Sequence, residues 1–150
     1  MQHKRLVIDA NILIRAVLGT RVQELIFGAV DQVAFYIAEA NFDEAERYLG
    51  QLAPARGMDE IIWRNALESV MTAIQFVGQE ELAPMKEHAL ARIGRRDADD
   101  WPALAAAMLL TCPVWTEDND FFGSGVATWT TETVHLYLAE RKSDEHGGTA

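Results

Sequence analysis

The sequence predicts an α/β fold, a three-layer α/β/α sandwich around a mostly parallel central sheet of four or five strands. Short apolar runs, typical of strands buried on both faces, alternate with longer segments whose apolar residues recur every three or four positions. The chain has 150 residues, of which 49% are hydrophobic and 24% are charged. This composition can build one buried core, and it lacks the polarity of a disordered chain.

Four segments have the length and composition of strands, and each follows or precedes a turn signal: residues 6–8, 33–37, 113–116 and the weaker 126–130. Amphipathic spacing predicts helices over residues 21–31, 40–52, 59–76, 80–93, 103–110 and 131–140. Asp99 or Asp100 is the expected N-cap of the helix that has Pro102 in its first turn. No strand is expected between the helices of residues 59–93.

Composition excludes several classes of protein. The chain has 23 acidic and 13 basic residues, a net charge of −10, which argues against general electrostatic binding of nucleic acid. A single cysteine, Cys112, excludes an intramolecular disulfide and a zinc site built on several thiolates. The N-terminal apolar run is too short for a signal peptide, and no stretch is long enough to cross a membrane. We therefore expect a cytoplasmic protein.

Acidic residues follow the predicted strands or begin the helix between them. The carboxyl ends of parallel strands meet at one edge of a sheet, which is where ligands bind in such folds. We expect a cluster there from these residues: Asp9, Asp43, Glu44, Asp99, Asp100, Asp118 and Asp120. Crowded carboxylates repel one another and favour a bound cation, and oxygen ligands select Mg²⁺ or Mn²⁺. This pattern indicates metal-assisted phosphodiester hydrolysis by water.

Each acid also has a purely structural explanation. Asp100 is a good N-cap, and Asp120 can cap the turn that holds Phe121. The acids of residues 43–46 can form the solvated face of an ordinary helix. The functional interpretation depends on several acids coinciding at strand ends.

Three segments, in order, resemble the motifs of PIN domains. Residues 7–13 resemble the opening motif, with Asp9 and Asn11, and residues 99–107 resemble the third motif, an Asp that starts a helix of small residues. Residues 116–121 are similar to the Thr-x-Asp-x-Asp-Phe motif. With the final strand and helix, the resemblance extends over about residues 4–140, and it implies a PIN-like domain over residues 1–141. The end of the chain, residues 142–150, is expected to be a disordered tail.

The resemblance implies a Mg²⁺- or Mn²⁺-dependent ribonuclease, since many PIN domains are toxins of VapBC-type toxin–antitoxin pairs. Asp9, Asp100 and Asp118 would bind metal, with Asp120 as an auxiliary ligand. The second-motif acid is best matched by Glu44. An RNA substrate, an antitoxin partner and a homodimer are the associations that the family implies.

Other positions have roles that the resemblance leaves less closely defined. Asp43 and Glu39 compete with Glu44 as the second-motif acid. Asn11 would orient Asp9 or a metal-bound water, and Thr116 would hold the backbone near Asp118 through its hydroxyl.

The basic cluster of Arg92, Arg95 and Arg96 has two interpretations. These side chains can be charges favoured by a helix C-terminus, or they can contact RNA phosphates beside the site. We predict the RNA contact for Arg95 and Arg96.

Two other functions compete with the ribonuclease. A phosphatase of the haloacid dehalogenase type also starts with a strand that ends in Asp. It needs a second Asp two residues later, where this chain has Asn11, and a downstream Lys, which is missing between Lys4 and Lys86. A catalytically degenerate PIN scaffold that binds protein or RNA is the other alternative.

Overall fold

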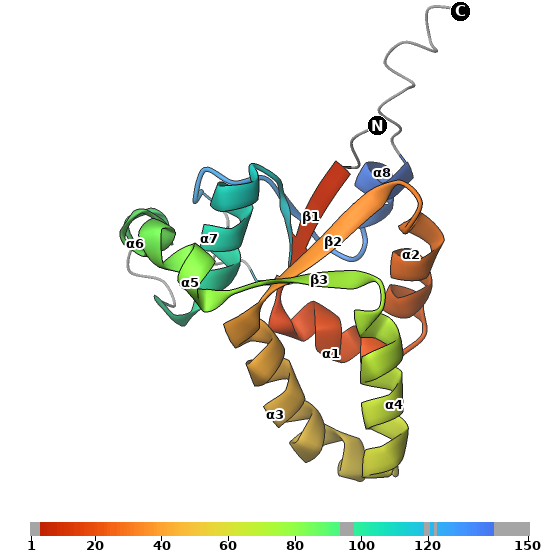
Figure 1. Ribbon diagram of the computed structural model, residues 1–150. Coiled ribbons are helices and arrows are strands. Elements are labelled where there is room, and N and C mark those ends of the chain that lie inside the picture. Colours follow the sequence, from red (N-terminus) through yellow and green to blue (C-terminus); the bar gives the residue numbers. More distant parts are fainter. Residues whose placement is uncertain (1–3, 94–97, 119–120, 122, 140–150) are drawn as a thin grey trace, which may run out of the picture.

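The structure is a computed structural model that describes residues 4–93, 98–118, 121 and 123–139. Figure 1 shows the arrangement of its helices and strands. In chain order these are β1 (Lys4–Ile8), α1 (Ala10–Leu18), α2 (Arg21–Ala29), β2 (Val33–Ala38), α3 (Glu39–Ala55), α4 (Glu60–Met71), β3 (Ile74–Val77), α5 (Gln79–Leu82), the 3₁₀ turn η1 (Ala83–Met85), α6 (Lys86–Ile93), the 3₁₀ turn η2 (Ala98–Asp100), α7 (Trp101–Leu110), β4 (Val114–Trp115), β5 (Thr128–Trp129) and α8 (Val134–Ala139).

Within the described residues, five strands form one parallel sheet in the order β3-β2-β1-β4-β5. The apolar strand β1 lies at its centre, where Leu6 pairs with Phe35 of β2 and Ile8 pairs with Trp115 of β4. Such a strand is covered on both faces, which explains its continuous apolar run. The sheet confirms the predicted fold class.

Alternate residues of β1 supply two separate cores. Leu6 and Ile8 are fully buried against apolar residues of α1, α2, α3, α4 and α8. Val7 is fully buried on the opposite face, against α5, α6 and α7. Figure 1 shows α5, α6 and α7 on one side of the strands and α1, α2 and α8 on the other. The molecule is therefore a three-layer sandwich, as the sequence predicts.

The region after α4 differs from the prediction. The expected helix over residues 59–76 is wrong over residues 72–76, because α4 ends at Met71 and Ile74–Val77 is a strand. The expectation that residues 59–93 contain no strand is wrong for the same reason. β3 pairs with β2 along its whole length, with Phe35 opposite Ile74 and Ala38 opposite Val77. Pairing with the edge of the sheet determined the structure here, against a spacing of apolar residues that suits a helix.

Two other helices also differ from expectation. Helix α1 was not predicted, although Ala10–Leu18 presents a buried stripe that includes Ile12 and Leu13. The last helix is shorter than predicted, since α8 begins at Val134 after a turn. The expected tail over residues 142–150 lies outside the described residues.

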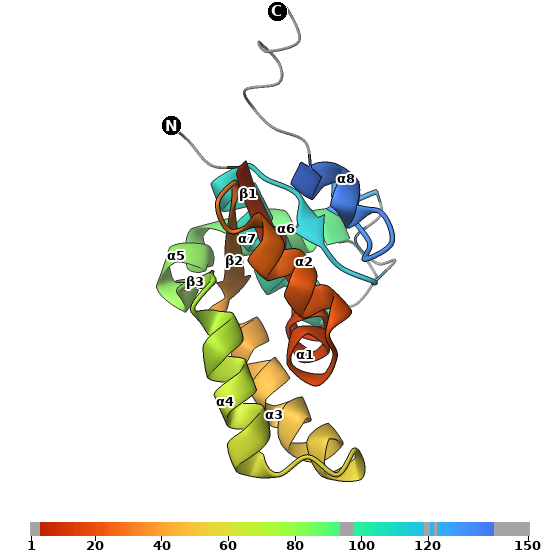
Figure 2. The ribbon, with the colours of Figure 1, turned by 90° about the vertical axis from the view of Figure 1, so that its right-hand side faces the viewer.

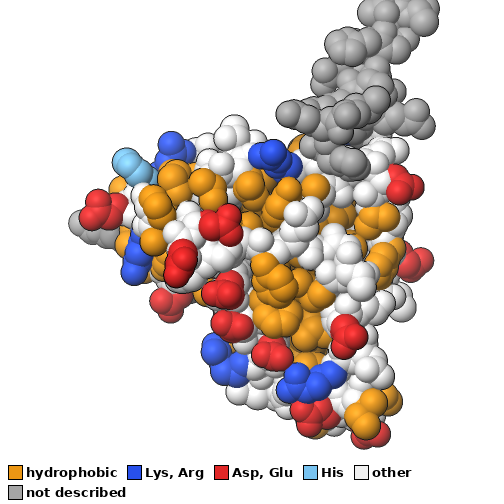
Figure 3. Space-filling model, viewed as in Figure 1, with side chains coloured by type: hydrophobic (Ala, Val, Ile, Leu, Met, Phe, Trp, Pro, Cys, Tyr) orange, Lys and Arg blue, Asp and Glu red, His pale blue; other side chains and the backbone are white. Residues whose placement is uncertain are grey.

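Helices α3 and α4 extend away from the sheet as a helical hairpin, and Figure 2 shows them projecting beyond α1. Their inner faces bury Leu49 and Trp63. Figure 3 shows hydrophobic side chains gathered at the surface over this hairpin and the β3 edge, where Ile62 and Phe76 are exposed. In the part of the chain that the structure describes, no helix has the length and apolar character needed to cross a membrane.

Candidate functional site

Asp9 lies at the end of the central strand, where the chain turns into α1. It is the N-cap of that helix, and its Oδ1 accepts a hydrogen bond of 3.0 Å from the backbone N–H of Ile12. The backbone N–H of Asp9 donates to the carbonyl of Trp115, which extends the pairing of β1 with β4. The backbone of Asp9 is thus fixed to the sheet, and capping uses only one of its two carboxylate oxygens.

Thr116 connects the first and last motifs. Its buried hydroxyl donates a hydrogen bond to Oδ2 of Asp9 and accepts one of 2.9 Å from the backbone N–H of Asp118. β1 and β4 are neighbours, so the residues that follow them come together even though they lie 107 positions apart in the chain. This one hydroxyl fixes the position of Asp9 relative to the loop that carries Asp118.

The surroundings of Asp9 disfavour the ionised form of its side chain. Burial is the largest cause and raises the pKa of Asp9 from 3.8 to about 6. The hydrogen bonds from Thr116 and Ile12 lower this pKa, while the negative charges of Asp118 and Glu44 raise it further. Asp118 and Glu44 are therefore close enough to Asp9 to act on its ionisation, so the structure brings three of the predicted acids to one edge of the sheet.

The structure separates Glu44 from its competitors on α3. Glu44 is half-buried and acts on Asp9, whereas its neighbour Asp43 is exposed and lines a hollow between α3 and α4. Glu39 is exposed at the start of the same helix. Adjacent residues on a helix point about 100° apart, so Asp43 and Glu44 face different surfaces.

Asp100 precedes α7 at the N-cap position, with Pro102 in the first turn. Its side chain makes no capping hydrogen bond to the helix, and its Oδ2 atom is inaccessible to solvent. Helix capping therefore does not explain this carboxylate. Helix α7 packs against β1, β2 and β4, which places Asp100 in the layer that covers these strands.

Other predicted residues lie apart from the acids or outside the described residues. Asn11 is exposed in the first turn of α1, and within the described residues its side chain makes no hydrogen bond to Asp9. Asp120, Arg95 and Arg96 lie outside the described residues. Arg92, the remaining member of the basic cluster, donates a hydrogen bond to the carbonyl of Ser124.

The donor set at this edge consists of carboxylate oxygens, with a threonine hydroxyl beside them, which is the chemistry that Mg²⁺ and Mn²⁺ prefer. Among the described residues, no three Asp, Glu, His or Cys side chains are gathered tightly enough to hold a metal ion as they stand. The negative charges of Asp118 and Glu44 nevertheless raise the pKa of Asp9. A bound cation would offset this repulsion between carboxylates. The residues present fit a divalent cation in ligand type and charge.

Two residues near the site were not identified from the sequence. Asn41 lies one helical turn before Glu44 and is buried, and its Oδ1 has no hydrogen-bond partner among the described residues. Glu117 accepts a hydrogen bond of 2.6 Å from the backbone N–H of Thr131, which ties the end of β5 to the loop between Thr116 and Asp118. The spacing of Asn41 three positions before Glu44 was the available signal, whereas nothing distinguished Glu117 from a solvated acid.

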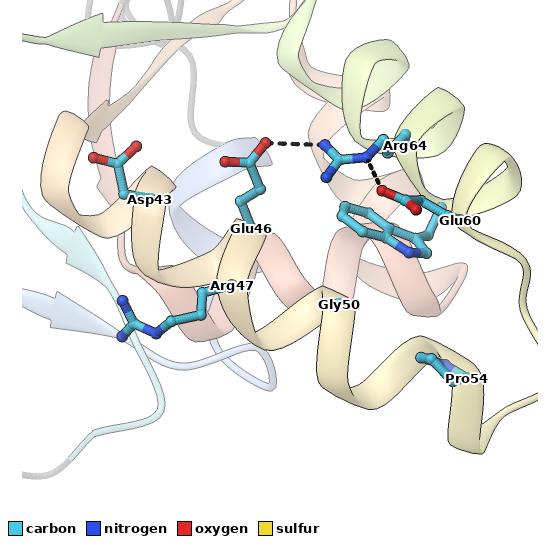
Figure 4. Close-up of a pocket in the computed structure, with 8 residues that line it drawn as sticks. Asp43, Glu46, Arg47, Gly50, Pro54, Glu60 and Arg64 are labelled. Carbon is cyan, nitrogen blue, oxygen red and sulfur yellow. Dashed lines mark hydrogen bonds and ion pairs between the residues drawn. The ribbon is translucent and has the colours of Figure 1, made fainter.

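A hollow of about 520 Å³ separates the middle of α3 from α4 (Figure 4). Arg64 lies across it and forms ion pairs with Glu60 at 2.7 Å and Glu46 at 3.1 Å. Its guanidinium lies 4.5 Å from the ring centre of Trp63. The charge of Arg64 is therefore already balanced by carboxylates of the same chain.

The fold matches those of solved structures over most of the chain. PAE2754 from Pyrobaculum aerophilum matches with a TM-score of 0.68 and 18% identity, covering 91% of this chain and 90% of that one. A toxin–antitoxin complex from Klebsiella pneumoniae contains a chain with a TM-score of 0.62 and 16% identity, covering 84% and 97%. A chain of FitAB, solved bound to an IR36 DNA fragment, gives 0.61 and 17%, covering 84% and 94%.

At these identities the structural matches show the fold, and the sequence shows the family. No curated protein matches the chain in sequence. The family model described as PIN domain matches residues 7–139, almost the whole described structure. The chain belongs to the PIN domain family, which is a family of nucleases.

Proposed function

We propose that this protein is a divalent-metal-dependent endoribonuclease. Asp9, Glu44, Asp100 and Asp118 would hold one or two Mg²⁺ or Mn²⁺ ions, with Asp120 as an auxiliary ligand. The observation that carries the proposal is the joint action of Asp118 and Glu44 on the partly buried carboxylate of Asp9, which Thr116 links to the Asp118 loop. The membership in a nuclease family supports the same reaction class.

A divalent ion bound there would lower the pKa of a coordinated water and neutralise charge on the scissile phosphodiester. The chain's own residues prepare for this. Above about pH 6, Asp9 is ionised and can act as a ligand. Thr116 fixes the Asp9 carboxylate and the Asp118 backbone together, so that two ligands keep their relative positions. Glu44 adds the third negative charge from a separate helix.

RNA cleavage tests the proposal directly. Wild-type protein and the Asp9→Asn variant are incubated with single-stranded RNA in Mn²⁺, and parallel reactions contain EDTA. We expect cleavage only by the wild type in Mn²⁺, with circular dichroism showing that the variant is folded. Undiminished, Mn²⁺-dependent cleavage by Asp9→Asn would refute the assignment. Mn²⁺ binding without any cleavage would favour a catalytically degenerate scaffold.

We also propose that the protein is the toxin of a VapBC-type pair and acts on RNA in the cytoplasm as a homodimer. The likeness to a chain of a toxin–antitoxin complex supports this role. The exposed Ile61, Ile62 and Phe76 offer apolar surface for protein contacts. Expression in a bacterial host should arrest growth for the wild type and not for Asp9→Asn, and light scattering should give the mass of a dimer. Equal growth with both proteins would contradict the toxin role.

A further inference from the structure

A second pocket lies along α1, from Asn11, two residues after Asp9, to the start of α2. It has a volume of about 550 Å³ and is bounded by α1, the start of α2, the C-terminal part of α3 and Thr131. Figure 2 shows α1 and α2 on the face that contains this region. Three arginines line the pocket, one from each helix: Arg15, Arg21 and Arg56.

The charge of this pocket is opposite to that of the whole protein. The chain carries a net charge of −10 and has only 13 lysines and arginines, yet three of them line this pocket, and no aspartate or glutamate of the described residues lines it with them. Among the described residues, none of the three arginines forms a salt bridge, whereas Arg64 in the α3–α4 hollow forms two. The pocket therefore presents positive charge that the described part of the chain does not neutralise.

Helix stability does not explain Arg21. It is the first residue of α2, where the helix dipole is positive and a cation is unfavourable. The preceding Thr20 makes no capping hydrogen bond to compensate. Replacing Arg21 by a neutral residue should therefore not destabilise the helix, which favours a ligand as the reason for a cation at this position.

The pocket begins near the candidate catalytic site along the chain, at Asn11 of α1. Asn11 lies two residues after Asp9, and Asn11 and Arg15 share one face of α1 because they are four residues apart. Along the helix axis, Arg15 lies about 9 Å beyond Asp9 at 1.5 Å per residue. Thr131, which also lines the pocket, donates its backbone N–H to the carboxylate of Glu117, next to Asp118 in the chain. A polymeric ligand bound at the acidic edge would reach the pocket by extending along α1.

We propose that this pocket binds phosphates of the RNA strand next to the bond that is cleaved, with Arg15, Arg21 and Arg56 as the phosphate-binding residues. This inference rests on the proposed ribonuclease function. Arginine suits the role because its planar guanidinium donates two parallel hydrogen bonds to phosphate. A metal-bound acidic edge and a basic pocket beside it give an RNA strand complementary charge in two places, despite the negative charge of the whole protein.

The test measures binding of a fluorescently labelled single-stranded oligoribonucleotide by anisotropy, in EDTA and over a range of salt concentrations. The triple variant R15Q/R21Q/R56Q is compared with the wild type. R64Q is the matched control, since it removes one arginine from the balanced α3–α4 hollow. We expect the triple variant to bind at least about tenfold more weakly at low salt, and the slope of log K against log salt to decrease in magnitude by about 2. The control should match the wild type.

Unchanged affinity and an unchanged salt slope in the triple variant would overturn the proposal, because the arginines would then not bind RNA. An equal loss in R64Q would also overturn it, because net charge alone would then explain the effect. Cleavage in Mn²⁺ is measured separately on the same proteins. Wild-type cleavage with unaltered binding by the triple variant refutes only the pocket, whereas arginine-dependent binding by a wild type that cleaves no RNA refutes only the proposed function.

Discussion

The acidic edge lies where β1 meets α1, whereas the basic pocket lies along α1 and the start of α2, and each collects charge of one sign. At the acidic edge, partial burial and the negative charges of Asp118 and Glu44 raise the pKa of Asp9. In the basic pocket, the three arginines are exposed and their ligand can approach from solvent. The first arrangement suits a small, hard cation, and the second suits an extended polyanion.

In the proposed reaction, the two regions would have separate roles. Residues that hold a metal ion act on the transition state, so their loss lowers kcat. Residues that hold distant phosphates act on ground state and transition state alike, so their loss raises KM. The α3–α4 hollow, where Arg64 is balanced by Glu46 and Glu60, belongs to neither region.

The largest expected effect is that of removing a ligand at the acidic edge. Asp118→Asn should lower kcat for RNA cleavage in Mn²⁺ by more than the roughly 10- to 100-fold that loss of an outer-shell partner costs. Arg21→Gln should instead raise KM and leave kcat nearly unchanged, because it weakens binding of the RNA. Steady-state kinetics on both variants measures the split. If both variants change the same parameter, the two regions are not functionally distinct.

A pair of neighbouring acids sharpens the comparison further. Glu44→Gln should reduce cleavage by at least about 100-fold if it is a ligand, because it is the acid of α3 that acts on Asp9. Asp43→Asn is its matched control, since Asp43 is exposed and faces the α3–α4 hollow. Rates under identical Mn²⁺ concentrations compare them. A greater loss in Asp43→Asn would reverse the assignment of the second-motif acid.

Thr116 should have a smaller effect. Thr116→Val keeps the shape of the side chain and removes the hydroxyl that links Asp9 to the Asp118 backbone. We expect cleavage or Mn²⁺ affinity to fall by about 10- to 100-fold, the usual cost of losing a partner that orients a metal ligand. Calorimetric titration with Mn²⁺ and cleavage assays measure both quantities. Wild-type values would show that the hydroxyl has only a structural role.

The raised pKa of Asp9 makes a prediction about stability without metal. The folded protein holds the Asp9 proton up to about pH 6 and the unfolded chain only up to about 3.8. Stability therefore falls as pH rises between these values and stays reduced above them. In EDTA near pH 8, Asp9→Asn should increase the free energy of unfolding by up to about 3 kcal/mol, which would appear as a higher Tm. The gain should be smaller near pH 5. A variant less stable than the wild type at both pH values would contradict this account.

The smallest expected effect lies away from both regions. Thr111 ends α7 with φ of 53°, a left-handed conformation that a β-branched residue adopts only at a cost. Thr111→Gly should stabilise the protein by up to about 1 kcal/mol. Thermal unfolding measures the gain, and neither kcat nor the salt dependence of RNA binding should change. A lower Tm would show that side-chain contacts of Thr111 outweigh the strain.

The sequence predicted the sheet and its helices well where apolar runs are long or central, and it missed β3. The residues Ala66, Val70, Ile74 and Val77 keep helical spacing through the true end of α4, and no glycine or proline marks the change. In β3, Gln75 and Phe76 are both exposed, so no alternation identifies a strand. Only pairing with β2, a tertiary contact, determines its structure.

The candidate site divides in the same way. Asp9, Thr116 and Asp118 were predictable because they follow neighbouring strands of a parallel sheet. The choice between Asp43 and Glu44 was not, because it depends on which way each side chain points from α3. The basic pocket was also hidden, since Arg15, Arg21 and Arg56 are dispersed along the chain and meet only when three helices pack.

Calorimetric titration with Mn²⁺ near pH 8 tests the central claim most directly, because it measures the cation at the acidic edge without assuming a substrate. The wild type should bind Mn²⁺, and Asp9→Asn and Glu44→Gln should each abolish or greatly weaken that binding, while Asp43→Asn retains it. Equal Mn²⁺ binding by the wild type and by both acidic-edge variants would contradict the account.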